Sequence, residues 1–231
     1  MKKLIQILLP IFIINSQVLA IAGFGLHLDR SMYSVAESTT PLTVGGVDVA
    51  SITQHGFDNG YGIGGYLYVD AIPVVDLDIE VIMLVSPYDF SFVQNDVVAV
   101  DKEQFGWVSG SGYFTLQKKL FKLSIPLLAK AKLSAGAGIN SHSSIPMISQ
   151  DMMESVMGAG NFGSGTLDTD ELITYLNDNK VSTTGFHIQT GLQFKILMLD
   201  SFLYYRQVFA DNVIPEAKGF GSLNLRLGMG F

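Results

Sequence analysis

The last thirteen residues, 219–231, alternate between apolar side chains and small or polar ones. Counting back from Phe231, every second residue is apolar or glycine: Met229, Leu227, Leu225, Leu223 and Gly221. This period of two is that of a β-strand with one apolar face. Such a strand would invite aggregation at the edge of a soluble sheet, whereas a closed barrel in lipid has no edge and needs an apolar outer face. The ending therefore favours a transmembrane β-barrel.

Seven further segments with the same period precede it. They are residues 23–29, 60–70, 75–85, 106–117, 123–140, 184–195 and 199–209. Most approach or exceed the length of about 9–11 residues that a tilted strand needs to cross a bilayer. The sequence thus predicts an all-β fold, an antiparallel up-and-down transmembrane β-barrel of eight strands. Because residues 42–53 and 92–100 are also β-prone, ten strands is the alternative count.

The predicted connections alternate between short and long. Residues 71–74, 118–122 and 196–198 would form short turns, whereas the other connections are residues 30–59, 86–105, 141–183 and 210–218. In outer-membrane barrels the short turns are periplasmic and the long loops extracellular, which puts both termini on the periplasmic side. Within the third long loop, residues 147–157 and 167–177 have helical spacing, with Asp168 or Thr169 as the N-cap. One or two short helices are expected there.

The chain begins with Lys2 and Lys3, an apolar run over residues 4–14 and small residues before Ala20. This is the pattern of a secretory signal peptide, and the run is too short to span a bilayer. Cleavage after Ala20 and after Ala22 both fit; we take residues 1–20 as the signal peptide and residues 21–231 as the outer-membrane β-barrel domain. Removing both lysines would change the formal net charge from −7 to −9. An acidic chain makes nucleic acid a poor partner, and the lack of cysteine excludes disulfides and cysteine-ligated metals.

The signal peptide, strand pattern, loop lengths and terminal Phe231 together resemble small bacterial outer-membrane β-barrels of the OmpA, OmpX and OmpW types. The resemblance does not extend to a motif of one particular family. It implies that Phe231 acts as the signal read by the barrel-assembly machinery. It also implies an outer-membrane location, contacts with outer-membrane lipid and lipopolysaccharide, and an extracellular ligand or small solute as a further partner.

The inward faces of the predicted strands carry charges of both signs. They form a candidate lumen charge network: Asp29, Asp76, Asp78, Glu80, Lys130, Lys132, Lys195, Arg206 and Arg226. An eight-stranded barrel is only wide enough inside to be filled by side chains, where an unpaired charge would be costly. We therefore expect a largely filled lumen and a structural or surface-interaction role. A narrow channel for small or hydrophobic solutes, gated by the third long loop, is the alternative.

The sequence predicts no catalytic residue, cofactor or metal site. Residues 158–163 and 60–65 have the spacing of a dinucleotide-binding glycine motif, but they lie in a loop and on a strand instead of a βαβ unit. A third hypothesis, a lipid-modifying enzyme, would require His27 or His142 to act on a serine. No Gly-x-Ser-x-Gly segment supports it, and we expect the protein not to be an enzyme.

Overall fold

The computed structural model describes residues 22–44, 46–70, 75–94, 97–125, 129–157, 169–215 and 217–231. The predicted signal peptide and the predicted turn at residues 71–74 lie outside the described residues.

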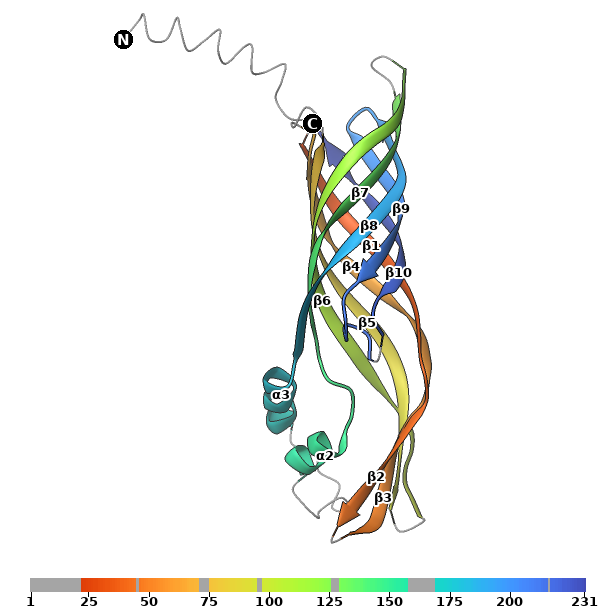
Figure 1. Ribbon diagram of the computed structural model, residues 1–231, viewed down its shortest axis with the longest axis vertical. Helices are drawn as coiled ribbons and strands as arrows, with labels where there is room; N and C mark the ends of the chain where they lie inside the picture. The colour runs from red at the N-terminus through yellow and green to blue at the C-terminus, as the bar shows by residue number, and fades with distance from the viewer. Residues whose placement is uncertain are drawn as a thin grey trace, which may run out of the picture.

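Eight antiparallel strands form a closed ring (Figure 1). In ring order they are β1 (Ala22–Val35), β4 (Phe57–Val69), β5 (Asp76–Gln94), β6 (Val97–Ile125), β7 (Ala129–Ser144), β8 (Val181–Ile196), β9 (Leu199–Phe209) and β10 (Phe220–Gly230). The first and last strands close the ring, with Gly23 opposite Gly230 and Met32 opposite Gly221. The predicted eight-stranded antiparallel barrel is confirmed.

Two more strands stand outside the ring. The hairpin of β2 (Ser38–Val44) and β3 (Val47–Gln54) continues the sheet from β5, where Ala50 lies opposite Gln94. The β-prone segments at residues 42–53 and 92–100 therefore extend the barrel at one end (Figure 1). Strand β2 is an open edge, and Pro41 lies within it. A proline on an edge strand removes a donor that a further strand would need for pairing.

The hairpin between β6 and β7 differs from the prediction. Residues 118–122, predicted as a turn, belong to β6, and so do residues 123–125 of the predicted fifth strand. The ladder accommodates them through a register shift between Lys119 and Phe121, a bulge that one extra residue produces. The turn at residues 196–198 is confirmed: β8 ends at Ile196, β9 begins at Leu199, and Leu197 has a φ of 56°.

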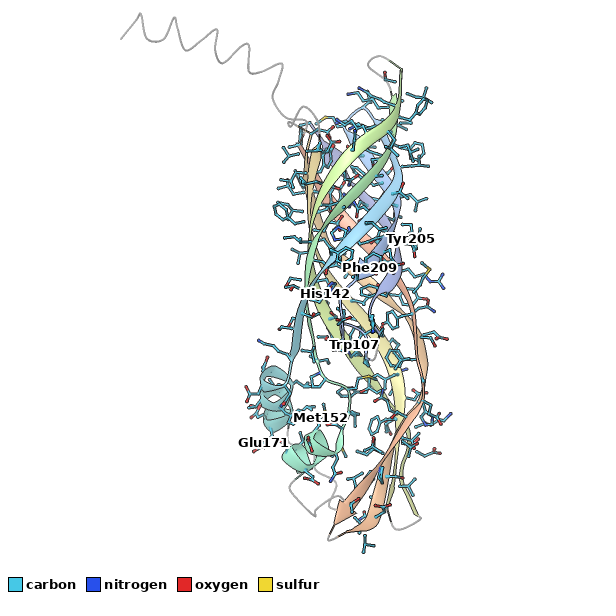
Figure 2. The ribbon with its side chains drawn as sticks, in the orientation of Figure 1. Trp107, His142, Met152, Glu171, Tyr205 and Phe209 are labelled. Carbon is cyan, nitrogen blue, oxygen red and sulfur yellow. The ribbon has the colours of Figure 1, made fainter. Side chains whose placement is uncertain are left out.

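The third long loop contains two short helices, as predicted, α2 (Gln150–Met157) and α3 (Thr169–Asp178). Ser149 caps α2, because its Oγ accepts a hydrogen bond of 3.2 Å from the Met152 amide. Met152, labelled in Figure 2, joins a hydrophobic cluster beyond the ring that connects α2 with the β2–β3 hairpin. Its buried members are Leu42, Ala50, Ile52, Phe92, Ile148, Met152 and Val156. None of the helices in the described parts is long and apolar enough to cross a membrane.

The wall of the ring is apolar outside and mostly polar inside. Along β10, Leu223, Leu225 and Leu227 are exposed, while Ser222, Asn224 and Arg226 are buried. The same alternation runs around the ring. Its exposed side chains include Phe24, Leu26, Leu28, Ile63, Leu67, Val81, Met83, Phe114, Leu116, Ile139, Phe186, Ile188, Phe194, Leu203 and Tyr205. The barrel thus carries an apolar belt, defined by these residues.

Candidate functional site

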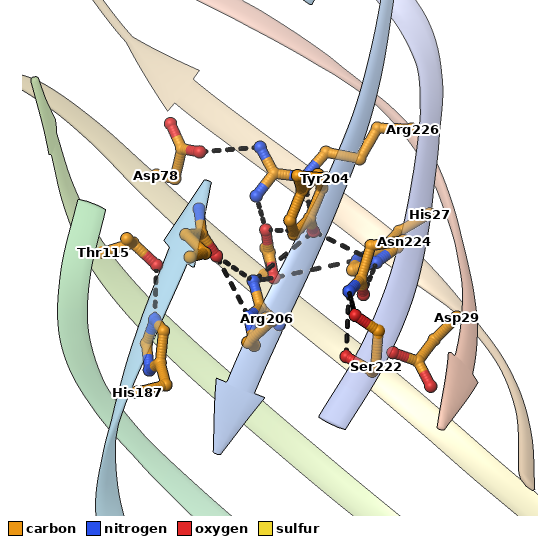
Figure 3. Close-up of polar contacts among 12 residues, drawn as sticks. His27, Asp29, Asp78, Thr115, His187, Tyr204, Arg206, Ser222, Asn224 and Arg226 are labelled. Carbon is orange, nitrogen blue, oxygen red and sulfur yellow. Dashed lines mark hydrogen bonds and ion pairs between the residues drawn. The ribbon is translucent and has the colours of Figure 1, made fainter. Parts of the chain in front are cut away.

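The centre of the lumen is a cluster of charged side chains that reaches from one wall to another (Figure 3). Glu80 on β5 contacts Arg206 on β9 and Arg226 on β10, two strands that are not neighbours of β5 in the ring. Arg226 Nη1 also donates a hydrogen bond of 2.7 Å to Asp78 Oδ2. Two guanidinium groups therefore face two carboxylates, and the formal charges balance.

Neutral groups complete the coordination of this cluster. Tyr204 Oη donates to Glu80 Oε1 at 2.8 Å and accepts from Arg226 Nε at 3.0 Å. Gln189 Oε1 accepts from Arg206 Nε at 3.0 Å and from Nη2 at 2.8 Å. The Arg206 guanidinium also lies 3.8 Å from the centre of the Tyr113 ring. Bidentate and stacked contacts of this kind hold a guanidinium in one orientation, so the cluster is a rigid crosslink of the lumen.

The candidate residue Asp29 does not join the arginines directly. Its Oδ1 accepts a hydrogen bond of 2.7 Å from Ser31, its neighbour two positions along β1. On the same strand, His27 Nε2 lies 2.8 Å from Asn224 Oδ1, and His27 Nδ1 lies 3.8 Å from Glu80 Oε2. Asp29 is therefore a separate hydrogen-bonded group beside the charged cluster (Figure 3).

A second charged cluster lies at the end of the barrel where the described chain ends at Phe231 (Figure 1). Lys132 Nζ donates to Asp70 Oδ2 at 2.6 Å, and Lys119 Nζ lies 3.0 Å from Asp76 Oδ1 and 3.6 Å from Asp70 Oδ1. Asp70 follows β4 and lies outside the strands. Burial alone would raise its pKa, but the hydrogen bonds with Asp76 and Lys132 and the lysine charges lower it below the usual value. Asp70 was missed because it is the last residue of the predicted strand at residues 60–70, and Lys119 because residues 118–122 were predicted as a turn.

The candidates Lys130 and Lys195 behave differently from Lys132. They lie opposite each other on β7 and β8, half-buried, and neither forms an ion pair with a described carboxylate. Asp200 was not among the predicted lumen charges. Its carboxylate accepts a hydrogen bond from the Tyr68 hydroxyl and another, of 2.7 Å, from Gln193 Nε2. The alternation of β9 could have predicted that Asp200 faces the lumen, because it is separated from Tyr204 and Arg206 by an even number of positions.

The two histidines on the far side of the cluster also make polar contacts. His142 Nδ1 lies 2.7 Å from Ser111 Oγ, and His142 Nε2 lies 3.0 Å from Asn140 Oδ1. His187 Nε2 lies 2.8 Å from Thr115 Oγ1. A serine, a histidine and an asparagine in contact are the residue types of a hydrolytic triad. All three are buried inside the lumen, however, so a lipid substrate has no path to the serine.

The two ends of the lumen are packed with aromatic and aliphatic side chains. Next to the second charged cluster, Tyr66, Tyr68, Phe202 and Tyr204 form a buried group whose ring centres are as close as 5.3 Å. A void of about 10 Å³ beside Tyr68 and Lys132 is at the lower limit for one water molecule. Towards the helices, a second hydrophobic cluster fills the lumen. Its buried members are Val35, Ile82, Leu84, Tyr88, Trp107, Tyr113, Val208, Ala210, Val213, Ile214 and Phe220.

In the described parts of the chain, no three histidine, aspartate or glutamate side chains are arranged to hold a metal ion. Most of the polar lumen residues that form these contacts bond to one another across the barrel interior.

Comparisons with known proteins assign the chain to no family. No family model matches the chain, and no curated protein matches it. Among solved structures, the chain is similar to the N-terminal β-barrel domain of Pseudomonas aeruginosa OprF, with 10% identity, a TM-score of 0.42, and coverage of 90% of this chain and 99% of that one. It is also similar to the attachment invasion locus protein Ail of Yersinia pestis, with 11% identity, a TM-score of 0.40, and coverage of 92% and 99%.

A third similar structure is the outer membrane protein OprG from Pseudomonas aeruginosa, with 8% identity, a TM-score of 0.40, and coverage of 91% and 97%. These three similar structures are small outer-membrane β-barrel proteins.

Proposed function

We propose that this protein is an integral outer-membrane β-barrel whose lumen is closed by side chains. Its role is then structural or one of surface interaction, carried by the extension beyond the ring. The observation that supports this most directly is the contact of Glu80 with both Arg206 and Arg226, which crosses the lumen at its centre.

The apolar belt supports insertion into a bilayer. A row of exposed leucines such as Leu223, Leu225 and Leu227 would be costly in water, since each apolar side chain left exposed forfeits about 1.5–3 kcal/mol of burial. Around a closed ring, lipid removes that cost, and each strand of the ring forms antiparallel ladders with both of its neighbours.

The packing of the lumen supports a closed barrel over a narrow channel. Arg206, Arg226 and Glu80 are essentially inaccessible to solvent, and the aromatic groups at both ends are buried as well. A permeating solute would have to break charge-assisted hydrogen bonds in a low-dielectric interior, where each broken pair leaves an uncompensated charge.

Conductance of the refolded protein in a planar bilayer tests this proposal. We expect the inserted protein to give no discrete openings, with insertion shown by its protease-protected barrel. A variant with Arg206→Ala and Glu80→Ala removes a charge of each sign from the same level of the lumen and should give measurable openings. Discrete openings of the unmodified protein, persisting with the third long loop intact, would favour the channel and overturn the proposal.

A lipid hydrolase is the weaker candidate because Ser111 and His142 face the lumen. Alanine substitution of His27 or His142 should leave the lipid A and phospholipid profiles of cells unchanged. A changed profile in either variant would contradict this.

A further inference from the structure

A cleft of about 680 Å³ opens beyond the ring, next to the hydrophobic cluster that fills the lumen on the side of the helices. Its volume lies within the range of about 300–1,000 Å³ that is usual for small-molecule sites. The cleft exists because the wall is incomplete there. Strand β10 pairs with β1 only as far as Met32, and β9 pairs with β8 only from Phe186, so β1 and β8 continue without partners on those sides.

The chain between β9 and β10 supplies one side of the cleft. Asn212, Val213, Pro215 and Ala217 line it, and two backbone hydrogen bonds of 3.0 Å hold this connection, from Asn212 N to Ala217 O and from Ala217 N to Ile214 O. Opposite it, Gln54 Nε2 lies 3.0 Å from Met147 Sδ, which joins the end of β3 to the chain before α2. These bonds link the segments that form two sides of the cleft.

The inner part of the cleft is apolar and ends blindly. Trp107, which is 2% exposed, and Val213 form its base and belong to the hydrophobic cluster that closes the lumen. Val35, Ile145 and Met147 add further apolar surface. Figure 2 shows Trp107 between the ring and the helices. Neither Arg206 nor Arg226 is among the described residues that line the cleft.

The outer part of the cleft is polar and carries a negative charge. Ser34, Ser38 and Asn212 contribute hydrogen-bonding groups, and Glu37 is the single charged residue among the described residues that line it. The Glu37 side chain is 60% exposed, and its Oε2 lies 2.9 Å from His55 Nδ1, which holds the carboxylate at the rim. No described lysine or arginine lines the cleft, so an anion would find no positively charged side chain there.

From this arrangement we propose that the cleft binds a small organic amine, with its apolar body against Trp107 and Val213 and its ammonium group at Glu37. An apolar base with one acid at the rim matches an amphiphilic cation in both shape and charge. This deepens the surface-interaction role and rests on the proposed function and on the predicted orientation, in which the long loops and this cleft lie outside the cell.

The chain contains one tryptophan, so its fluorescence reports on the base of the cleft. The full-length protein, refolded in a zwitterionic detergent, is titrated with 4-phenylbutylamine and, in parallel, with the matched anion 4-phenylbutyrate. We expect a saturable change in Trp107 emission with the amine and at least about tenfold weaker binding of the carboxylate, because a hydrogen-bonded charge pair has that effect on affinity. Equal responses to both compounds, or a response to the amine that never saturates, would overturn the proposal.

Two variants and a control sharpen the test. Glu37→Gln removes the charge while keeping the shape, and it should weaken amine binding about tenfold. Ala217→Leu narrows the cleft and should weaken amine binding as well. Glu103 is an exposed acid outside the cleft, so Glu103→Gln should leave the affinity for the amine unchanged. Unchanged affinity in Glu37→Gln would contradict the proposal. The two tests are independent because conductance does not depend on this cleft. A negative binding result would not contradict the closed lumen, and discrete openings in a bilayer would not contradict amine binding.

Discussion

At the scale of single residues, Glu80 is the centre of the barrel interior. It contacts two arginines and accepts a hydrogen bond from Tyr204, so its removal would leave two buried guanidinium groups with less opposing charge. Buried ion pairs add little to stability compared with apolar packing, but losing one partner of such a pair is strongly destabilising.

The substitution Glu80→Ala should therefore lower the free energy of unfolding by about 3–5 kcal/mol. Urea titration of the refolded protein, followed by the mobility shift between folded and unfolded barrel in gels, measures this. Glu103→Ala removes the same side chain from an exposed position on β6 and should leave the urea midpoint unchanged. Equal midpoints for the two variants would show that the cluster contributes nothing to stability.

Strand alternation predicts which residues face the lumen but gives no information about their partners. The inward direction of four side chains could be predicted because each lies in a regularly alternating strand: Asp78, Glu80, Arg206 and Arg226. Which acid meets which base depends on the stagger of strands that are far apart in the ring, and no local pattern encodes that stagger. Glu80 and Arg226 meet across a ladder that passes through β4 and β1.

At the scale of elements, local turn signals were the weak point of the prediction. Residues 118–122 were predicted as a short turn between two strands. In the structure β6 continues through it with a bulge, since the outer surface beyond the apolar belt tolerates lysine as well as leucine. The helices of the third long loop were predictable, because their apolar spacing is local.

Glycine positions in the wall provide a test at this scale. A Cβ on Gly138 of β7 would collide with the backbone carbonyl oxygen of Phe114 and would lie 2.8 Å from His187 Cε1. Gly138→Ala should therefore destabilise the barrel by about 1–3 kcal/mol, the usual effect of overpacking. Its counterpart Gly112→Ala, in β6, places a Cβ where no atom lies within 4 Å. In urea titrations the first variant should unfold earlier than the second; the reverse order would contradict the packing of this wall.

At the scale of the whole molecule, the two ends of the barrel differ. One end has the turn at Leu197 and the C-terminal residue Phe231. The other end carries the helices and the β2–β3 hairpin (Figure 1). The proposed orientation puts the helices outside the cell and the turn in the periplasm.

The chain has no cysteine, so single cysteines can report this orientation. In intact cells, a membrane-impermeant maleimide should label Asp178→Cys, an exposed position of α3. It should label Leu197→Cys only after the outer membrane is permeabilised, because this exposed residue lies at the opposite end. Labelling of Leu197→Cys alone in intact cells would invert the proposed orientation.

The pairing of β1 with β10 determines when the barrel can form. Gly23 and Gly230 are partners although some two hundred residues separate them in the sequence, so the ring cannot close before β10 is available to pair with β1. Until then both edges of the sheet are open, and contacts between distant segments form slowly because a long loop must be ordered first. Closure is therefore the most non-local step in forming this barrel, and without β10 the ladder that joins both ends of the sheet is missing.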